Sequence, residues 1–265
     1  MDLNSFRTTS NSDISEIYSM PRVTTIASQR GLKPGFSMDI RNGWNFNDPK
    51  HRAKAIEKLE SEKPVLLVGS PPCTMFSTIT RLWNLKKMTP EVRSARMKEA
   101  ILHVAFAVKL YKIQIAGGRF FLHEHPDQAS SWDLRCIQDL LKAPGVQLVR
   151  GDMCAFGMQQ EDKEGVGYIR KRTKFCTNCP EVAAELEHRC DGTHRHITLV
   201  DGRPSKAATY PPKLCAAICR GLEKYNNKSL TTIPHKNPPC DGRRDGSGNC
   251  AIDELFGNPR VGSLG

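Results

Sequence analysis

Short apolar runs alternate with longer stretches of mixed polarity along most of the chain. The run from Val65 to Val68 is short, branched and closed by turn residues, which is typical of a buried strand. Similar runs predict strands at residues 14–18, 36–40, 65–68, 119–123 and 146–150. Each predicted strand therefore precedes a polar or amphipathic segment that can return the chain to the next strand.

The intervening segments predict helices. Asp48 followed by Pro49 is the signal of a helix cap and first turn. The longest predicted helix runs from Thr89 to about Ala116, and its apolar residues recur on one face at helical spacing. Helices are expected at residues 21–30, 49–61, 89–116, 131–142 and 212–224.

The order of these elements predicts an α/β domain. Strands that alternate with helices form a mostly parallel sheet with helices on both faces. Later, residues 168–176 and 195–200 are extended with no long helix between them, which predicts an antiparallel C-terminal strand pair. We expect one domain over residues 13–226, between a disordered leader (1–12) and a disordered tail (227–265) rich in Pro, Gly, Asn and Arg.

Composition narrows the class of protein. The 265 residues are enough for one large core, or one core and a small satellite. No apolar run approaches the ~20 residues of a membrane helix, and Met1 to Phe6 lacks the basic-then-apolar pattern of a signal peptide. Ten cysteines without a secretion signal indicate thiols rather than a disulfide framework. We therefore expect no membrane association and a reducing intracellular compartment, the nucleus or the cytoplasm.

The formal net charge is +11. Such an excess favours a polyanionic partner, most simply nucleic acid, through neutralisation of phosphates and release of counterions. A solvated basic surface is the alternative, since no arginine-rich tract or aromatic–basic repeat accompanies the charge.

The segment from Pro64 to Ser77 carries the first candidate chemistry. Its strand delivers Ser70-Pro71-Pro72-Cys73 to the carboxyl edge of the sheet, where open α/β sheets place their ligands. The two prolines fix their φ angles and would aim Cys73 in one direction, as a nucleophile requires. The alternative is a proline-terminated strand with a small buried cysteine.

This pattern, strand-Pro-Pro-Cys-x-x-Phe-Ser, resembles the nucleophile loop of the cytosine-C5 methyltransferases. Residues 14–225 also resemble methyltransferase-like domains of retroelements and viruses, which share Ser-Pro-Pro-Cys-Thr-x-Phe-Ser and His-Glu-His-Pro. The resemblance implies a Rossmann-like methyltransferase-type fold, S-adenosylmethionine as cofactor and nucleic acid, with DNA as first choice, as partner. It also implies that the Cys73 thiolate attacks C6 of a flipped-out cytosine, whose C5 then takes the methyl group.

Phe120 to Pro126 is a second strand that ends in polar residues and a proline. By resemblance, Glu124 matches the glutamate of the family's Glu-Asn-Val motif, which binds the Watson–Crick edge of the cytosine. His125-Pro126 stands where Asn-Val is expected. A charged turn in which Glu124 pairs with a histidine is the structural alternative.

Tyr168 to Phe175 is the third candidate segment. In a strand, Arg170 and Arg172 lie on one face and Lys171 on the other. Two guanidinium groups on one face can hold a phosphate or a base carbonyl. The spacing resembles the family's Gln-x-Arg-x-Arg motif, which implies contact of Arg172, or as second choice Arg170, with the cytosine O2. A solvated basic edge strand is the alternative.

The family's Phe-x-Gly-x-Gly cofactor loop is missing, and residues 16–22 contain no glycine. The resemblance still implies cofactor contacts by Glu16, Ser19, Asp39 and Pro71, although Asp39 also fits the family's later Gly-Asp-Ile motif. A separate target-recognition domain is absent or very short. A catalytically inactive binding module of a mobile-element or viral protein is therefore the second functional hypothesis.

Cys176-Thr-Asn-Cys179 and Cys190-Asp-Gly-Thr-His194-Arg-His196 form two close pairs of metal ligands. A tetrahedral Cys3His zinc site suits this spacing, with Cys176, Cys179, Cys190 and His194 as ligands and His196 as the alternative fourth. Such a site would stabilise a hairpin over residues 176–196 that otherwise lacks a core. Free thiols on a polar hairpin are the alternative.

Overall fold

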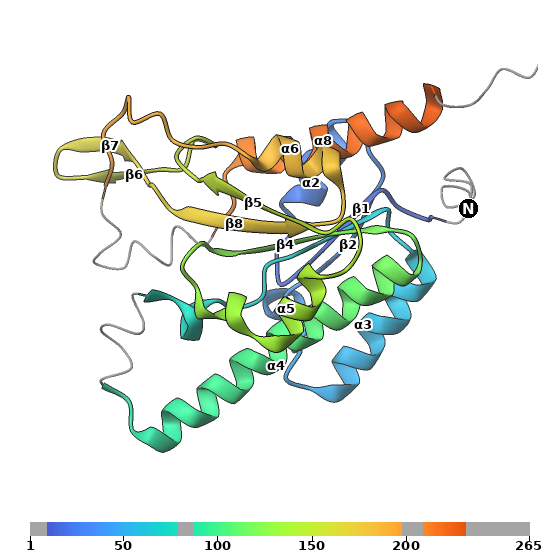
Figure 1. The fold of residues 1–265 in the computed structure, drawn as a ribbon, viewed down its shortest axis with the longest axis horizontal. Helices are drawn as coiled ribbons and strands as arrows, with labels where there is room; N and C mark the ends of the chain where they lie inside the picture. Colours follow the sequence, from blue (N-terminus) through green and yellow to red (C-terminus); the bar gives the residue numbers. More distant parts are fainter. Residues whose placement is uncertain (1–9, 79–86, 198–208, 232–265) are drawn as a thin grey trace, which may run out of the picture. The chain divides into compact units, whose positions relative to one another are not determined.

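The computed structural model describes residues 10–78, 87–197 and 209–231 (Figure 1). Most of the predicted disordered leader and tail lies outside these residues. Residues 10–12 belong to the fold, because Asn11 donates a backbone hydrogen bond to Glu62 and Ser12 is buried. Residues 227–231 form the end of the last helix, so the expected tail begins at least five residues too early.

Six strands form the main sheet in the order β2-β1-β3-β4-β8-β5 (Figure 1). The adjacent pairs β2–β1, β1–β3 and β3–β4 are parallel, and β8 pairs antiparallel with both β4 and β5. The mostly parallel α/β sheet is therefore confirmed. The strands are β1 (Ile14–Ile17), β2 (Pro34–Met38), β3 (Leu66–Gly69), β4 (Phe120–Pro126), β5 (Gln147–Asp152) and β8 (Arg172–Thr177).

The C-terminal half differs from the prediction in its pairing. The expected partner of β8, residues 195–200, forms only a parallel bridge between His196 and Tyr168 within its described part, and residues 198–200 lie outside the described residues. A separate antiparallel hairpin, β6 (Gln159–Asp162) with β7 (Gly165–Tyr168), was not predicted. The extended segment expected over 168–176 is broken between β7 and β8.

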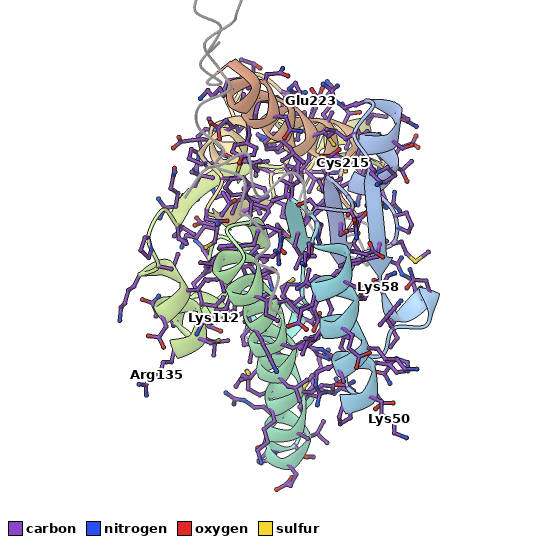
Figure 2. All side chains as sticks on the ribbon, turned by 90° about the vertical axis from the view of Figure 1, so that its right-hand side faces the viewer. Lys50, Lys58, Lys112, Arg135, Cys215 and Glu223 are labelled. Carbon is purple, nitrogen blue, oxygen red and sulfur yellow. The ribbon has the colours of Figure 1, made fainter. Side chains whose placement is uncertain are left out.

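Helices cover both faces of the sheet, as expected. Figure 1 shows α2, α6 and α8 on one face and α3, α4 and α5 on the other. Figure 2 shows side chains such as Lys50, Lys112 and Arg135 at the periphery, whereas Cys215 lies inside. The bounds are α2 (Val23–Gln29), α3 (Pro49–Glu62), α4 (Pro90–Ala116), α5 (Arg135–Leu141), α6 (Pro180–Leu186) and α8 (Pro212–Thr231). Among the described residues, no helix is both long enough and apolar enough to cross a bilayer.

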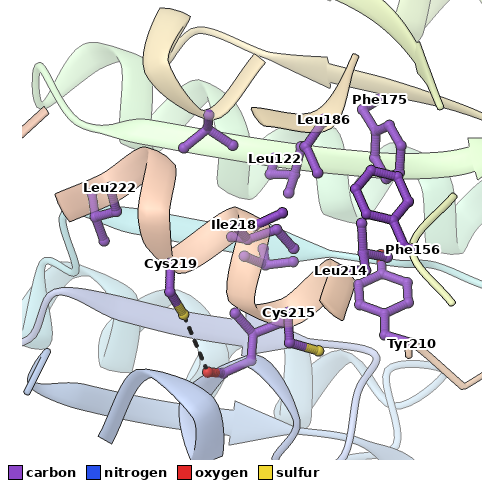
Figure 3. Close-up of a cluster of buried hydrophobic side chains, with 14 of the residues drawn as sticks. Leu122, Phe156, Phe175, Leu186, Tyr210, Leu214, Cys215, Ile218, Cys219 and Leu222 are labelled. Atoms are coloured by element: carbon purple, nitrogen blue, oxygen red, sulfur yellow. Dashed lines mark hydrogen bonds between the residues drawn. The ribbon is translucent and has the colours of Figure 1, made fainter. Parts of the chain in front are cut away.

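Helix α8 closes one of the two cores. Leu214, Ile218 and Leu222 recur every four residues and form the buried stripe of this helix. Figure 3 shows them beside Leu122 of β4 and Leu186 of α6. The second core lies between the sheet and α3, α4 and α5. Burial on both sheet faces explains why the parallel strands are apolar on both sides.

The strand order changes direction between β1 and β3, because β2 lies beyond β1 on one side and β4 beyond β3 on the other. Open α/β sheets bind ligands outside the carboxyl ends of the strands at such a point. Gly69 ends β3 there, and a Cβ atom on it would lie only 2.0 Å from the Tyr111 hydroxyl of α4. Only a glycine lets the strand pack this closely against the helix.

Glu16 of β1 is fully buried and anchors the start of α2. Its carboxylate accepts hydrogen bonds from the backbone N–H of Arg22 and Thr24, at 2.8 and 3.0 Å, and from the Thr24 hydroxyl at 2.6 Å. These donors would otherwise be unsatisfied at a helix start. These hydrogen bonds tie the carboxylate to the fold, and the cofactor contact expected of Glu16 stays a prediction.

We predict that Glu16→Ala lowers the free energy of unfolding by about 2–4 kcal/mol, because buried donors lose a charged acceptor. Urea denaturation measures the change. The matched control is Glu60→Ala on the exposed face of α3, which should stay within about 0.5 kcal/mol of wild type. An unchanged stability combined with weaker binding of S-adenosylmethionine would support the cofactor role.

Candidate functional site

A pocket of about 550 Å³ lies at the carboxyl ends of β1, β2, β3 and β4. This volume falls within the range of small-molecule sites. Its lining brings together residues from the strand ends, from α4 and from the segments before β8 and α8. Those used below are Tyr18, Ser19, Asp39, Trp44, Ser70, Pro71, Cys73, His103, Glu124, Lys171 and Tyr210.

Cys73 lies in the pocket lining, half-buried, directly before a 3-10 turn (η2, Thr74–Phe76). The buried side chains of Met75 and Phe76 anchor this turn in the core of α3 and α4. The loop is therefore held on both sides of the cysteine, by the prolines before it and by the turn after it. This rigid placement agrees with what a nucleophile needs.

His125 clamps the same loop from β4. Its ring is fully buried, with Nε2 2.9 Å from the Pro71 carbonyl oxygen and Nδ1 2.6 Å from the Ser131 hydroxyl. Burial lowers the pKa of His125, so the ring is neutral at pH 7. In the tautomer that satisfies both partners, Nε2–H donates to Pro71 and Nδ1 accepts from Ser131. His125, which stands where the resemblance implies an asparagine, thus has a structural role.

Glu124 and Lys171 form an ion pair in the pocket wall, with Nζ 3.2 Å from Oε1. The Tyr210 hydroxyl lies 3.5 Å from Oε2 and 2.7 Å from the Ser70 hydroxyl. Although burial disfavours the ammonium, Glu124 raises the pKa of Lys171 above its ordinary value. Lys171 is therefore charged at pH 7.

The ion pair acts on Cys73 in two opposite directions. Burial is the largest effect and raises the pKa of the Cys73 thiol. The positive charge of Lys171 lowers this pKa, and the negative charge of Glu124 raises it. The cysteine is therefore mostly a thiol at pH 7, and its thiolate depends on Lys171.

Lys171 occupies the place that we expected for Arg172 or Arg170. Both arginines are exposed, and neither lines the pocket. Lys171 contacts Glu124, whereas Arg170 and Arg172 are exposed, and the strand alternation that we expected over these residues does not apply because β8 begins only at Arg172. Strand β8 begins at Arg172, which pairs with Asp152 of β5. Lys171 therefore lies just before the strand.

Ser19, Asp39 and Pro71 all line the pocket, as the resemblance implies for cofactor-binding residues. Asp39 follows β2 and caps a short 3-10 turn (η1, Ile40–Asn42). Its Oδ1 accepts hydrogen bonds from the backbone and side chain of Arg41. Although burial opposes it, this contact holds the pKa of Asp39 below its ordinary value, so the carboxylate is charged at pH 7.

An aromatic part of the lining was not predicted. Tyr18, Trp44 and Phe46 form edge or tilted ring contacts, and the Tyr18 hydroxyl lies 3.2 Å from Nδ1 of His103. Tyr18 has a φ of 58°, a left-handed conformation that favours glycine. The turn after β1 is therefore made by a tyrosine where the family has glycines. Nothing in the local sequence around Tyr18 indicates this conformation.

A second group of chemically active side chains lies apart from this pocket's lining. Ligand atoms of Cys154, Cys190, His194 and His196 all lie within 4.8 Å of one another. Such a group can hold a metal ion. It contains only two of the four predicted ligands, Cys190 and His194.

Cys176 and Cys179 belong to the two hydrophobic cores instead. Burial raises the pKa of both thiols to about 12, so they are neutral at pH 7. The expected hairpin over residues 176–196 does not form, because β8 ends at Thr177 and α6 follows from Pro180. Proline directly after Cys179 is a first-turn helix signal that could have revealed α6.

Neither the models of known protein families nor the curated proteins compared with the chain give a match. The function is therefore argued from the geometry of the pocket.

We predict that Lys171 and Glu124 shift the titration of Cys73 in opposite directions. Lys171→Met should raise the thiol pKa further and slow alkylation by iodoacetamide at pH 8 by about three- to tenfold, since only the thiolate reacts. Glu124→Gln should lower the pKa and speed alkylation. Mass spectrometry of the peptide containing Cys73, across a pH series, gives both midpoints.

Cys136 of α5 is the internal control, since neither Lys171 nor Glu124 is among the groups that shift its pKa. Its alkylation rate should be equal in all three proteins. Equal shifts at Cys136 and Cys73 would mean that the substitutions loosen the whole fold. No shift at either cysteine would contradict the described electrostatics.

Proposed function

We propose that this chain is an S-adenosylmethionine-dependent, cytosine-C5 methyltransferase-like protein that acts on nucleic acid. One observation carries the proposal: Cys73, Glu124 and Lys171, from three distant parts of the sequence, line the same pocket. A thiol, a carboxylate and a cation together match the needs of nucleophilic attack on a pyrimidine.

The other wall of the pocket fits the cofactor. The two hydrogen bonds that Arg41 donates to Asp39 both reach Oδ1, and a carboxylate has further lone pairs that can accept a hydrogen bond from a ribose hydroxyl. Tyr18 and Trp44 offer aromatic surface for an adenine ring. S-adenosylmethionine would supply an electrophilic methyl group here.

Cys73 would act as nucleophile on the base. Its thiolate, favoured by Lys171, would form a bond to C6 of a cytosine while the electrons of the C5–C6 double bond take up the methyl group at C5. Loss of the C5 proton and breakage of the sulfur–C6 bond would then release the product. Glu124 would hold the Watson–Crick edge of the base.

The partner proposed is nucleic acid, with DNA as first choice. The net charge of +11 supplies long-range attraction to a phosphate backbone. The exposed Arg170 and Arg172 flank Lys171 in the chain, which makes them candidates for phosphate contacts rather than base contacts.

A catalytically inactive binding module of a mobile-element or viral protein is the second candidate. The observation that favours it is the raised pKa of Cys73, together with the lack of glycines in the loop after β1. Such a module would retain the pocket and the positive charge without forming a covalent bond to a base.

Bound zinc is the third part of the proposal. The group of Cys154, Cys190, His194 and His196 offers two sulfur and two nitrogen ligands, a set that zinc prefers. A closed set of four leaves no position for a catalytic water, so the role is structural.

We predict that an oligonucleotide duplex containing 5-fluorocytosine forms a covalent adduct with Cys73 in the presence of S-adenosylmethionine. Fluorine at C5 cannot leave as a proton does, so the sulfur–carbon bond persists. Denaturing gel electrophoresis and peptide mass spectrometry locate the adduct. Cys73→Ser should form none, and Cys136→Ser should behave as wild type. An adduct in Cys73→Ser would disprove the assignment.

Calorimetric titration with S-adenosylmethionine distinguishes the two candidate functions. For the enzyme we predict saturable binding that weakens about tenfold or more in Asp39→Asn, because a charged acceptor of the ribose is lost. Asparagine can still accept the cap bond from Arg41, so the turn is retained. Asp133→Asn, an exposed position near α5, is the control and should bind as wild type. Absence of binding by wild type would favour the inactive module.

A further inference from the structure

The distances within the Cys/His group match those of a tetrahedral zinc centre. The Sγ atom of Cys190 lies 3.6 Å from Nε2 of His194 and 3.3 Å from Nε2 of His196. Zinc bonds of 2.0–2.3 Å in a tetrahedron separate sulfur and nitrogen ligands by about 3.5 Å. Cys190, His194 and His196 are thus already at the sulfur–nitrogen spacing of one metal shell, and the Sγ atom of Cys154 lies within 4.8 Å of their ligand atoms.

Neighbouring groups support two of these ligands, Cys190 and His194, as outer shells of metal sites do. The backbone N–H of Gly192 points to Cys190 Sγ at 3.3 Å, a turn that Gly192 allows through its φ of +78°. Asp191 lies 3.8 Å from Nδ1 of His194, on the ring side opposite to Nε2. Asp152, fully buried, accepts the backbone N–H of Cys190 at 2.9 Å.

The ligands come from two segments, which lie on either side of residues 168–171. Cys154 belongs to the turn after β5, and the backbone N–H of Met153 donates to the Lys171 carbonyl at 3.0 Å. His194 and His196 belong to the segment on the other side. There, Tyr168 exchanges backbone hydrogen bonds with Arg195 and Ile197, and its ring lies 4.1 Å from that of His194.

We propose that Cys154, Cys190, His194 and His196 bind one structural Zn²⁺, and that this ion holds residues 168–171 so that Lys171 reaches Glu124 and Cys73. The coupling between zinc and Lys171 takes its residues, Lys171, Glu124 and Cys73, from the proposed function. It does not require that methyl transfer takes place. Residues 169–171 lie in the break between β7 and β8, where Ile169 donates to the Met158 carbonyl and the Lys171 carbonyl accepts from Met153, so the position of Lys171 depends on the segments at its two sides. Zinc binds ligands from both of these segments and so links them to each other.

Metal content is the first test. Protein purified without added metal should contain about one zinc per chain, and both Cys154→Ser and His196→Ala should contain almost none. His196→Cys keeps a soft ligand and should retain the ion. Cys136→Ser, which removes a thiol outside the group, is the control. Zinc in Cys154→Ser at the wild-type level, or a disulfide between Cys154 and Cys190, would overturn the site.

The second test measures the coupling without methyltransferase activity. Chelator-treated wild-type protein should alkylate Cys73 at least about threefold more slowly at pH 8, because Lys171 no longer approaches the thiol. Return of Zn²⁺ should restore the rate. In Lys171→Met, chelation should change the rate no further. A chelation effect of equal size with and without Lys171 would overturn the coupling.

A third measurement covers the case in which metal-free protein loses its fold. Co²⁺ added in place of zinc reports its own ligands, through the absorption of tetrahedral cobalt and a thiolate-to-metal band. His196→Cys should strengthen the thiolate band relative to wild type, and Cys136→Ser should leave it unchanged. An octahedral spectrum without a thiolate band would overturn the proposed ligands, whatever the outcome of the cofactor titration.

Discussion

The ion pair between Lys171 and Glu124 is the interaction on which the candidate site depends. The two side chains are only 16% and 7% exposed, so each charge has lost most of its water. A buried charge without a partner is strongly unfavourable, and removal of one partner from such a pair costs about 3–5 kcal/mol. The pair therefore fixes the end of β4 against the segment before β8. It also sets the charge around Cys73.

One strand end serves both the ion pair and the nucleophile loop. Side chains alternate along β4, so Glu124 points to Lys171 and Tyr210 while His125 points to the opposite side, to Pro71 and Ser131. The histidine holds the loop and the glutamate faces the pocket. A shift of β4 by one residue would exchange these roles and dismantle both contacts.

The sequence predicts local patterns well and long-range pairing less well. Helix starts such as the cap of α3 at Asp48 follow from residues within a few positions. Cys73 and Glu124 were predicted to lie together because Cys73 follows a buried strand and Glu124 lies near the end of another, and parallel strands end at one edge. The choice of Lys171 over Arg172 required the register of β8, which depends on contacts with Asp152 far along the chain.

The candidate metal ligands show the same limit. Cys154 is a single cysteine after β5, and only the antiparallel pairing of β5 with β8 and the return of the chain after α6 bring it to Cys190. The spacing of Cys176 and Cys179 resembled a ligand pair, but Cys176 lies in β8 and Cys179 at the start of α6, and their thiols enter two different cores. Short ligand spacing alone cannot distinguish these outcomes.

A lysine beside Glu124 has a consequence for the proposed reaction that an arginine would not have. A guanidinium group frequently pairs with both oxygens of a carboxylate, and would then occupy a lone pair on each of them. The Lys171 ammonium contacts Oε1, whereas Oε2 has only the Tyr210 hydroxyl at 3.5 Å. One oxygen can therefore keep the lysine while the other accepts a hydrogen bond from an entering cytosine. In this arrangement Lys171 continues to favour the Cys73 thiolate after the base has bound, which is when the proposed attack requires it.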